Sequence, residues 1–223
     1  NYWSIGNGKK RENSIGSRIL YKGIKENKND IPYLKGSNFN RYSIEEPTQY
    51  LRHNYSDYLD SNDIFRFSVE ILETTPKIIY RQTSSSLIGT IENNKYHNDK
   101  TVHIILNNKF NTIDLRYVLG IFNSQLLNYL YKSYSNEDGR VFAQVKIVNI
   151  KSLPFILGTI ESQNKIIGYV EQLLQLNKDL QAATLESKKE QIKTKIDYHE
   201  DKVNTLVYQL YNLTDEEIKL IEK

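Results

Sequence analysis

The densest group of side chains that could read a nucleic acid is a run of six polar residues after the strand-like segment 77–80. Arginine pairs with the edge of guanine, glutamine with the edge of adenine, and hydroxyls with either base. A strand that ends in these groups would present them to DNA bases. A hydrophilic hairpin loop has the same composition, and the residues alone favour the loop. The run is Arg81, Gln82, Thr83, Ser84, Ser85 and Ser86.

A second group, Lys95-Tyr96-His97-Asn98, is expected in a loop, where His97 is either part of an ordinary polar turn or a base contact. Binding to a duplex also needs cations that neutralise phosphates. Arg41, next to Tyr42, could supply one cation and one stacking ring. The other candidate phosphate contacts are Lys9, Lys10, Arg11 and Arg140.

The sequence contains no convincing catalytic motif. It has no cysteine, so disulfides, thiolate chemistry and cysteine-based zinc sites are excluded, and its four histidines lack metal-ligand spacing. Glu186-Ser187-Lys188 matches half of a metal-nuclease motif, but its helical context predicts a solvated surface. His199 falls on an apolar seam and is expected to pack there. We therefore predict no catalytic residue, bound cofactor or metal in this chain.

Composition and charge indicate a folded protein with an uneven charge distribution. Residues 1–157 contain 21 basic and 15 acidic residues, whereas residues 158–223 contain 9 and 12. A polyanion would therefore meet the first part, unless the difference is chance. No apolar run approaches the roughly 18 to 20 residues of a membrane span. We expect a cytoplasmic bacterial protein and, because methionine is absent, a piece of a longer chain.

The first part contains short strand-like runs between polar clusters, without βαβ alternation. One amphipathic helix interrupts them, with Thr112 as its expected N-cap and a weak point at residues 123–125. We predict an α+β fold with a mixed or antiparallel sheet. The expected strands are 17–22, 64–72, 77–81, 87–91, 102–106 and 141–148.

The last part is predicted to be an α-helical, coiled-coil-like hairpin that turns within residues 181–187. A single continuous helix is the alternative. Thr159 is the expected cap of the first helix, and Thr214 with Glu217 forms a capping box for a short final helix. The expected buried positions are Ile160, Ile167, Val170, Leu174 and Leu180 in the first helix, and Ile192, Ile196, His199, Val203, Leu206, Leu210 and Leu213 in the second.

Six segments in this order resemble the TaqI-like C-terminal specificity domain, the target-recognition region of type IIG and type I restriction-modification enzymes. The usual Gly-x-x-Thr-Gly opening is absent at residues 23–28. The matching segments are Tyr21–Ile24, Tyr33–Tyr42, Pro76–Thr83, Leu119–Leu126, Lys151–Phe155 and the Leu-Tyr-x-Leu-Thr ending at 210–214.

The resemblance implies a DNA target-recognition domain over residues 1–157 and a helical spacer or dimerisation region over 158–223. It implies double-stranded DNA as partner, together with a methyltransferase part of the same or another chain. That part would use S-adenosylmethionine, and a nuclease part, where present, Mg²⁺. A homodimer could form through the helices. The alternative hypothesis is a protein-interaction module without DNA affinity.

Overall fold

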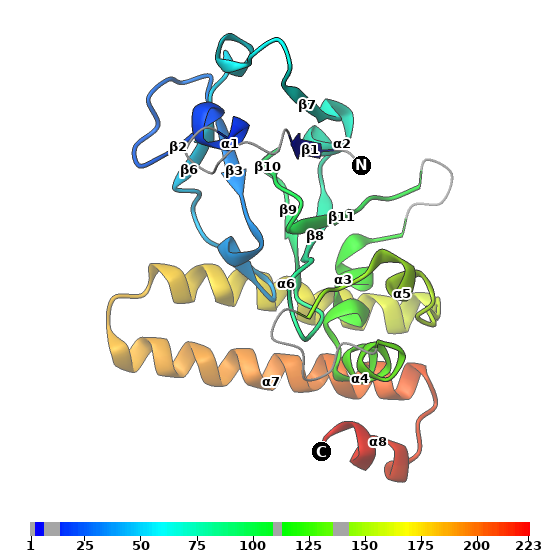
Figure 1. Ribbon diagram of the computed structural model, residues 1–223. Coiled ribbons are helices and arrows are strands. Elements are labelled where there is room, and N and C mark those ends of the chain that lie inside the picture. Colours follow the sequence, from blue (N-terminus) through cyan, green and yellow to red (C-terminus); the bar gives the residue numbers. More distant parts are fainter. Residues whose placement is uncertain (1–2, 7–13, 109–112, 136–142) are drawn as a thin grey trace.

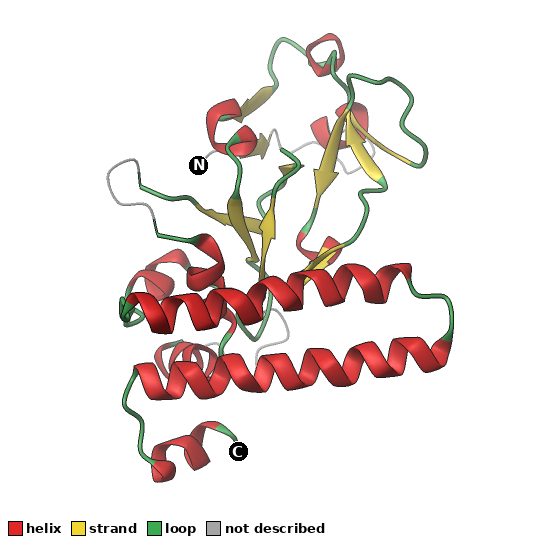
Figure 2. Ribbon diagram, turned by 180° about the vertical axis from the view of Figure 1, so that it is seen from behind, coloured by secondary structure: helices red, strands yellow, loops and turns green. Residues whose placement is uncertain are grey.

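The computed structural model describes residues 3–6, 14–108, 113–135 and 143–223. A β-rich part stands on a layer of helices, in which two long helices run side by side (Figure 1). The view from behind shows the same two-part arrangement, with the short connection between the long helices at one end (Figure 2). The expected α+β class is confirmed, because small sheets and helices occupy separate parts of the molecule.

Two sheets make up most of the β-rich part. One has the order β10-β3-β6-β2, in which only the β10–β3 pair is parallel, and the other is antiparallel with the order β11-β8-β9. Their strands are β2 (Leu20–Lys22), β3 (Ile31–Leu34), β6 (Gln49–Leu51), β8 (Lys77–Arg81), β9 (Gly89–Glu92), β10 (His97–Asn98) and β11 (Val102–Ile105).

Two smaller antiparallel pairs complete the strands: β1 (Trp3–Gly6) with β7 (Ile64–Phe67), and β4 (Phe39–Asn40) with β5 (Ser43–Ile44). The β4–β5 hairpin reaches down to the helical layer (Figure 1). Short helical turns lie between the strands. They are α1 (Ile15–Ile19), η2 (Gly36–Asn38), η3 (Tyr55–Tyr58) and α2 (Val69–Glu73).

Three expected strands were wrong in part, because helical turns replace some of their residues, in two cases after a local side-chain cap. Ser14 accepts a hydrogen bond from the Ser17 amide, so residues 15–19 form α1 and only 20–22 form a strand. Ser68 similarly caps α2, which replaces the second half of the expected strand 64–72. In the expected strand 141–148, Gln144 makes one isolated bridge, with Thr83, and α5 (Ile147–Lys151) follows.

The amphipathic helix breaks at its predicted weak point. Ser124 is extended (φ −62°, ψ 154°), ending α3 (Leu115–Asn123), and its hydroxyl accepts from the Leu127 amide to cap α4 (Gln125–Tyr134). The expected cap was wrong, because α3 begins after Asp114, whose carboxylate accepts from the Arg116 amide. Thr112 lies outside the described residues.

The helical hairpin is confirmed as α6 (Ile160–Ala182) and α7 (Glu186–Leu210). Thr159 caps α6, and the predicted capping box at Thr214 and Glu217 begins α8 (Asp215–Ile221), which lies against α4. Across the described residues, no helix is long and apolar enough to span a membrane.

The buried face of the hairpin is shifted from the expected one. Ile160 is 77% exposed, whereas Ile166 and Leu173 are fully buried with Val170, because α6 presents a second face to α3. In α7, Ile192 and Val203 are buried as expected, and Val207 and Tyr208 join them. The other expected positions are partly buried.

The largest hydrophobic core is continuous from the β8–β9 sheet through α3 and α4 to the helix pair. At its centre, Gly120 lies so close to α6 that a Cβ there would meet Ile166 Cγ2 at 2.6 Å and Val170 Cγ2 at 3.0 Å. The glycine therefore permits the close approach of α3 and α6. The expected boundary between residues 157 and 158 falls within this shared core, and the division into two domains remains a prediction.

Candidate nucleic-acid interface

Arg81, the first candidate reading residue, is bound to the neighbouring hairpin. Its Nε donates to the Phe39 carbonyl at 2.9 Å, and its Nη2 donates to the same carbonyl and to Asn40 Oδ1, the latter at 2.6 Å. Burial lowers the pKa of Arg81, while nearby Glu45 raises it. The guanidinium thus holds β4 against β8. A side chain that contacts bases directly would instead have these donors available.

The rest of the candidate loop is a structural junction. The Gln82 carbonyl accepts from the Val145 amide at 2.6 Å, and the Ser84 amide donates to Ala143 O at 3.0 Å. Leu87 is buried, and its amide donates to Asn128 Oδ1 at 2.7 Å. Among the predicted base contacts here, only the side chains of Thr83 and Ser85 are exposed.

Two buried asparagines of the α3–α4 break complete this junction. Asn123 Nδ2 donates to the Gly89 carbonyl at 3.0 Å, and the Gly89 amide donates back to Asn123 Oδ1 at 2.9 Å. Asn128 Nδ2 donates to Ser124 O at 2.9 Å. We call loop 82–88 and these two asparagines the junction, because their bonds fasten the β8–β9 sheet to the helical layer.

The second candidate loop divides into an exposed and a buried half. Lys95 is exposed with a positive φ of 57°, and Tyr96 is half-buried, with its hydroxyl accepting from Asn94 Nδ2 at 3.1 Å. Burial, first among its causes, raises the pKa of Tyr96.

The expectation that His97 and Asn98 lie in a loop was wrong, because both belong to buried strand β10. His97 is 1% exposed, packs against the Phe67 ring, and has a pKa lowered by burial to about 4.

Arg41 and Tyr42 form the turn of the β4–β5 hairpin. Tyr42 has a φ of 58°, is buried, and donates its amide to the Gly89 carbonyl at 3.2 Å. Burial raises the pKa of the Tyr42 phenol, and burial also raises that of Glu200 on α7, which the Arg41 charge opposes. Lys9, Lys10, Arg11 and Arg140 lie outside the described residues.

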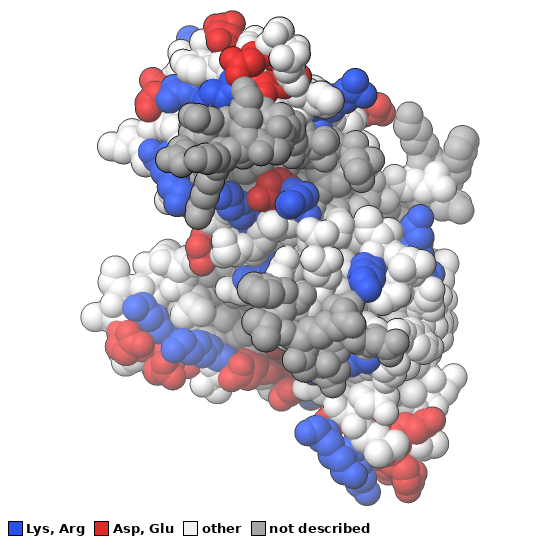
Figure 3. Space-filling model, viewed as in Figure 1, with Lys and Arg blue, Asp and Glu red and all other residues white. Residues whose placement is uncertain are grey.

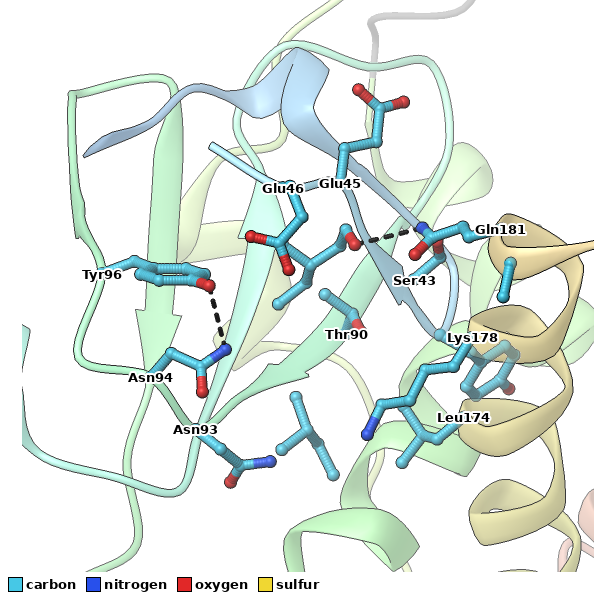
Figure 4. Close-up of a pocket in the computed structure, with 14 residues that line it drawn as sticks. Ser43, Glu45, Glu46, Thr90, Asn93, Asn94, Tyr96, Leu174, Lys178 and Gln181 are labelled. Carbon is cyan, nitrogen blue, oxygen red and sulfur yellow. Dashed lines mark hydrogen bonds between the residues drawn. The ribbon is translucent and has the colours of Figure 1, made fainter. Parts of the chain in front are cut away.

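A hollow of about 580 Å³ opens between the hairpin, the β9–β10 loop and the second half of α6. Sequence analysis missed most of its polar residues. In Figure 4, Lys178, Asn93 and Glu46 extend into it from three sides, with Tyr96 beside them, while the Glu45 carboxylate turns away. The hollow is lined by Tyr42, Ser43, Ile44, Glu45, Glu46, Thr90, Ile91, Asn93, Asn94, Tyr96, Leu174, Lys178, Gln181 and Ala182.

Gln181 fixes the helical wall of this hollow. Its Nε2 donates to Ser43 Oγ at 2.8 Å and to the Ile44 carbonyl at 3.1 Å, joining α6 directly to β5 (Figure 4). The Asn93-Asn94 pair was a usable sequence signal, since two neighbouring amides could pair with base edges. Ser43, Asn93 and Lys178 are too far apart in sequence to suggest a shared site.

Side chains of both charge signs lie on this face of the molecule. Figure 3 shows Lys and Arg side chains on the β-rich part above the notch that separates it from the outer half of the helix pair, with Asp and Glu side chains also on the β-rich part, and the helix pair shows both signs as well. Lys95 is among the exposed cations beside the hollow.

The half-motif of a nuclease is confirmed as a solvated helix surface. Glu186 and Lys188 are exposed in the first turn of α7, where Glu186 pairs with Lys189 at 3.3 Å. Within the described ranges, no group of three or more His, Cys, Asp or Glu residues could hold a metal ion. His199 packs between Tyr169 and Tyr198, as its place on the seam predicted.

Comparisons with known proteins found a matching family model and solved structures of similar fold. A model of the TaqI-like C-terminal specificity domain matches residues 31–155. The fold is similar to that of the type IIL restriction-modification enzyme MmeI, solved in complex with DNA, with a TM-score of 0.59 and 10% identity. The match covers 88% of this chain and 31% of MmeI, so the chain spans about a third of that protein's length. No curated protein matches the sequence.

Proposed function

Because the chain belongs to the family of TaqI-like C-terminal specificity domains, we propose that it recognises a specific double-stranded DNA sequence for a restriction-modification enzyme. The match to residues 31–155 carries the proposal, because this segment includes the hairpin, the β8–β9 sheet and both candidate loops. The fold shared with MmeI, whose structure was solved with DNA, supports it. The chain itself supplies no chemistry in this proposal.

Phosphate contacts come from exposed cations of the β-rich part, such as Lys95, and base contacts from the exposed groups near the hairpin. Arg81 acts indirectly, since its guanidinium already binds Phe39 and Asn40. His97 contributes to packing, because its ring is buried. Thr83 and Ser85 remain candidates for direct contacts, being exposed.

The catalytic steps belong to a methyltransferase part of the same or another polypeptide, with S-adenosylmethionine as methyl donor. Methylation of a paired base requires that the base leave the duplex, and the role of this chain is to hold the flanking DNA in register. In this scheme a nuclease part, if one is attached, would use Mg²⁺.

One exposed apolar surface is suited to attachment to that partner. Phe155, Leu157 and Ile160 are 44%, 60% and 77% exposed in the segment that leads into α6. The segment is held rigidly, because Tyr117 donates to the Ile156 carbonyl at 2.8 Å and Tyr211 donates to the Pro154 carbonyl at 2.8 Å. Exposed apolar surface on a fixed backbone is typical of protein contact sites.

The experiment is selection of the chain against a randomised duplex pool at two salt concentrations, with sequencing of the bound fraction. We expect one short site to be enriched and its binding to weaken with salt, because phosphate contacts release counterions. Absence of binding at low salt would contradict the proposal and favour the protein-interaction module. Salt-sensitive binding without enrichment would show a DNA-binding part that does not specify sequence alone.

A further inference from the structure

We propose that the hollow between the β4–β5 hairpin, the β9–β10 loop and α6 reads base edges, and that α6 supplies Lys178 to this site. The inference rests on the proposed function and deepens it. It assigns part of the recognition to a helix outside residues 31–155, the segment that matches the family. The helix pair would then be a component of the reading surface as well as a spacer.

The polar side chains that enter the hollow have unused bonding capacity. In the described part of the chain, Glu46 and Lys178 make no ion pair, and the Asn93 side chain makes no hydrogen bond. Glu46, Asn93 and Lys178 are also exposed. These groups therefore contribute little to holding the fold, in contrast to the fully bonded Asn123 and Asn128.

The mixture of groups is suited to bases rather than to phosphates. A carboxylate beside DNA is repelled by phosphates, but it can accept a hydrogen bond from the amino group of cytosine. An asparagine amide pairs with the adenine edge, and a lysine with guanine or with a phosphate. Glu46, Asn93 and Lys178 thus offer an acceptor, a forked amide and a cation within one concave surface.

The position of Lys178 is fixed by two neighbours on the same face of α6. Gln181, three residues later, binds Ser43 and Ile44 of the hairpin. Leu174, four residues earlier, lines the hollow and packs against the main core. Residues at these spacings share one helix face, so Lys178 is directed into the hollow between two anchored positions.

The test compares three variants of the hollow, Glu46→Gln, Asn93→Ala and Lys178→Gln, in the same duplex selection. Glu70→Gln is the control for Glu46, because Glu70 is an exposed glutamate of α2 that does not line the hollow. Lys188→Gln is the control for Lys178, being an exposed lysine of α7. Thermal unfolding of each variant verifies that the fold is retained.

Glu46→Gln and Asn93→Ala are expected to relax the preference at individual positions of the site, losing roughly five- to 150-fold in discrimination there. Lys178→Gln is expected either to relax one position or to reduce the salt slope by about one unit, as for a lost phosphate contact. Both controls should retain the wild-type site and salt slope.

Different results would contradict the role of the hollow and the proposed function of the whole chain. If the wild-type chain enriches one site and all three hollow variants enrich the same site with an unchanged salt slope, the hollow is a surface crevice and the inference is overturned. If the wild-type chain enriches no site, the proposed function itself fails as an activity of this chain, before any variant is compared.

Discussion

The junction and the hollow are built from similar polar residues but use them in opposite ways. At the junction, Asn123 and Asn128 are buried and their amides bind the backbone of Gly89 and Leu87. At the hollow, Asn93 and Asn94 are exposed. Residue type and spacing made loop 81–86 look like the reading surface, yet its bonds are mostly internal. The difference teaches that residue composition alone does not show whether polar groups hold the fold or are available to a ligand.

The largest expected effect is a loss of stability at low pH caused by protonation of His97, the buried half of the second candidate loop. The exposed half, which contains Lys95, should not contribute to this loss. An unperturbed histidine titrates near pH 6.5, and burial lowers the pKa of His97 to about 4. The unfolded chain therefore binds more protons between these values, and stability is lost as pH falls through this window. The loss due to His97 should reach about 3 kcal/mol near pH 4.

The measurement is urea unfolding at several pH values for wild type and His97→Gln. Subtracting the two curves removes the contribution of carboxylates, which titrate in both proteins. Parallel curves between pH 4 and 6.5 would show that His97 is accessible to protons in the folded state and belongs with the exposed half of the loop.

The next largest effect tests the junction itself. Asn123→Ala leaves the buried amide of Gly89 without its partner and removes one of two hydrogen bonds to the Gly89 carbonyl, which still accepts from the Tyr42 amide. An unpaired buried group costs about 1–3 kcal/mol, so a loss of about 2 kcal/mol in the free energy of unfolding is expected. The matched change in the hollow, Asn93→Ala, should alter stability by less than about 0.5 kcal/mol.

Chemical denaturation of both variants gives the comparison directly. A similar loss of stability in the two proteins would mean that the hollow is as much a structural element as the junction, and the distinction drawn between them would be wrong.

Gly120→Ala tests whether the helix pair is fixed to the same core. The added methyl would meet Ile166 and Val170, and overpacking of this kind costs about 1–3 kcal/mol. Thermal unfolding measures the cost. Gly168→Ala is the control, because a Cβ there has no neighbour within 4 Å, and the substitution should be neutral or slightly stabilising.

The smallest expected effect distinguishes positioning from reading at Arg81. Arg81→Lys keeps a cation but cannot reproduce the bonds from Nε and Nη2 to the hairpin. Stability should fall by about 1 kcal/mol and DNA affinity should decrease, while the selected sequence stays the same. A changed base preference at one position would instead restore Arg81 as a direct base contact.

Local features of the fold were predictable where a few neighbouring residues determine them. The break at Ser124, the cap at Thr159 and the box at Thr214 each depend on one side chain and the next turn of backbone. Strands such as β3 and β6 were missed, because Ile31 pairs with Leu51, twenty positions later in the sequence, and neither segment is strongly patterned alone.

The candidate site was predictable only in part, for the same reason. The sequence identified Arg41, Arg81 and Tyr96, which lie around the hairpin. It could not show that the Arg81 guanidinium donates its hydrogen bonds to Phe39 and Asn40. The hollow combines residues near 45, 94 and 178, and only the tertiary structure brings these together. Each residue, considered alone, is an ordinary surface polar group.

The continuous core has a consequence for how such recognition units are inherited and engineered. Gly120 of α3 lies against Ile166 and Val170, so residues on either side of position 157 have to fit one another closely. A recombination event or a designed chimera that joins one protein's residues 31–155 to another's helices would mismatch this contact. We therefore expect the exchangeable unit to extend through α7, so that a swap made at its outer ends keeps the fold intact and transfers the proposed DNA specificity.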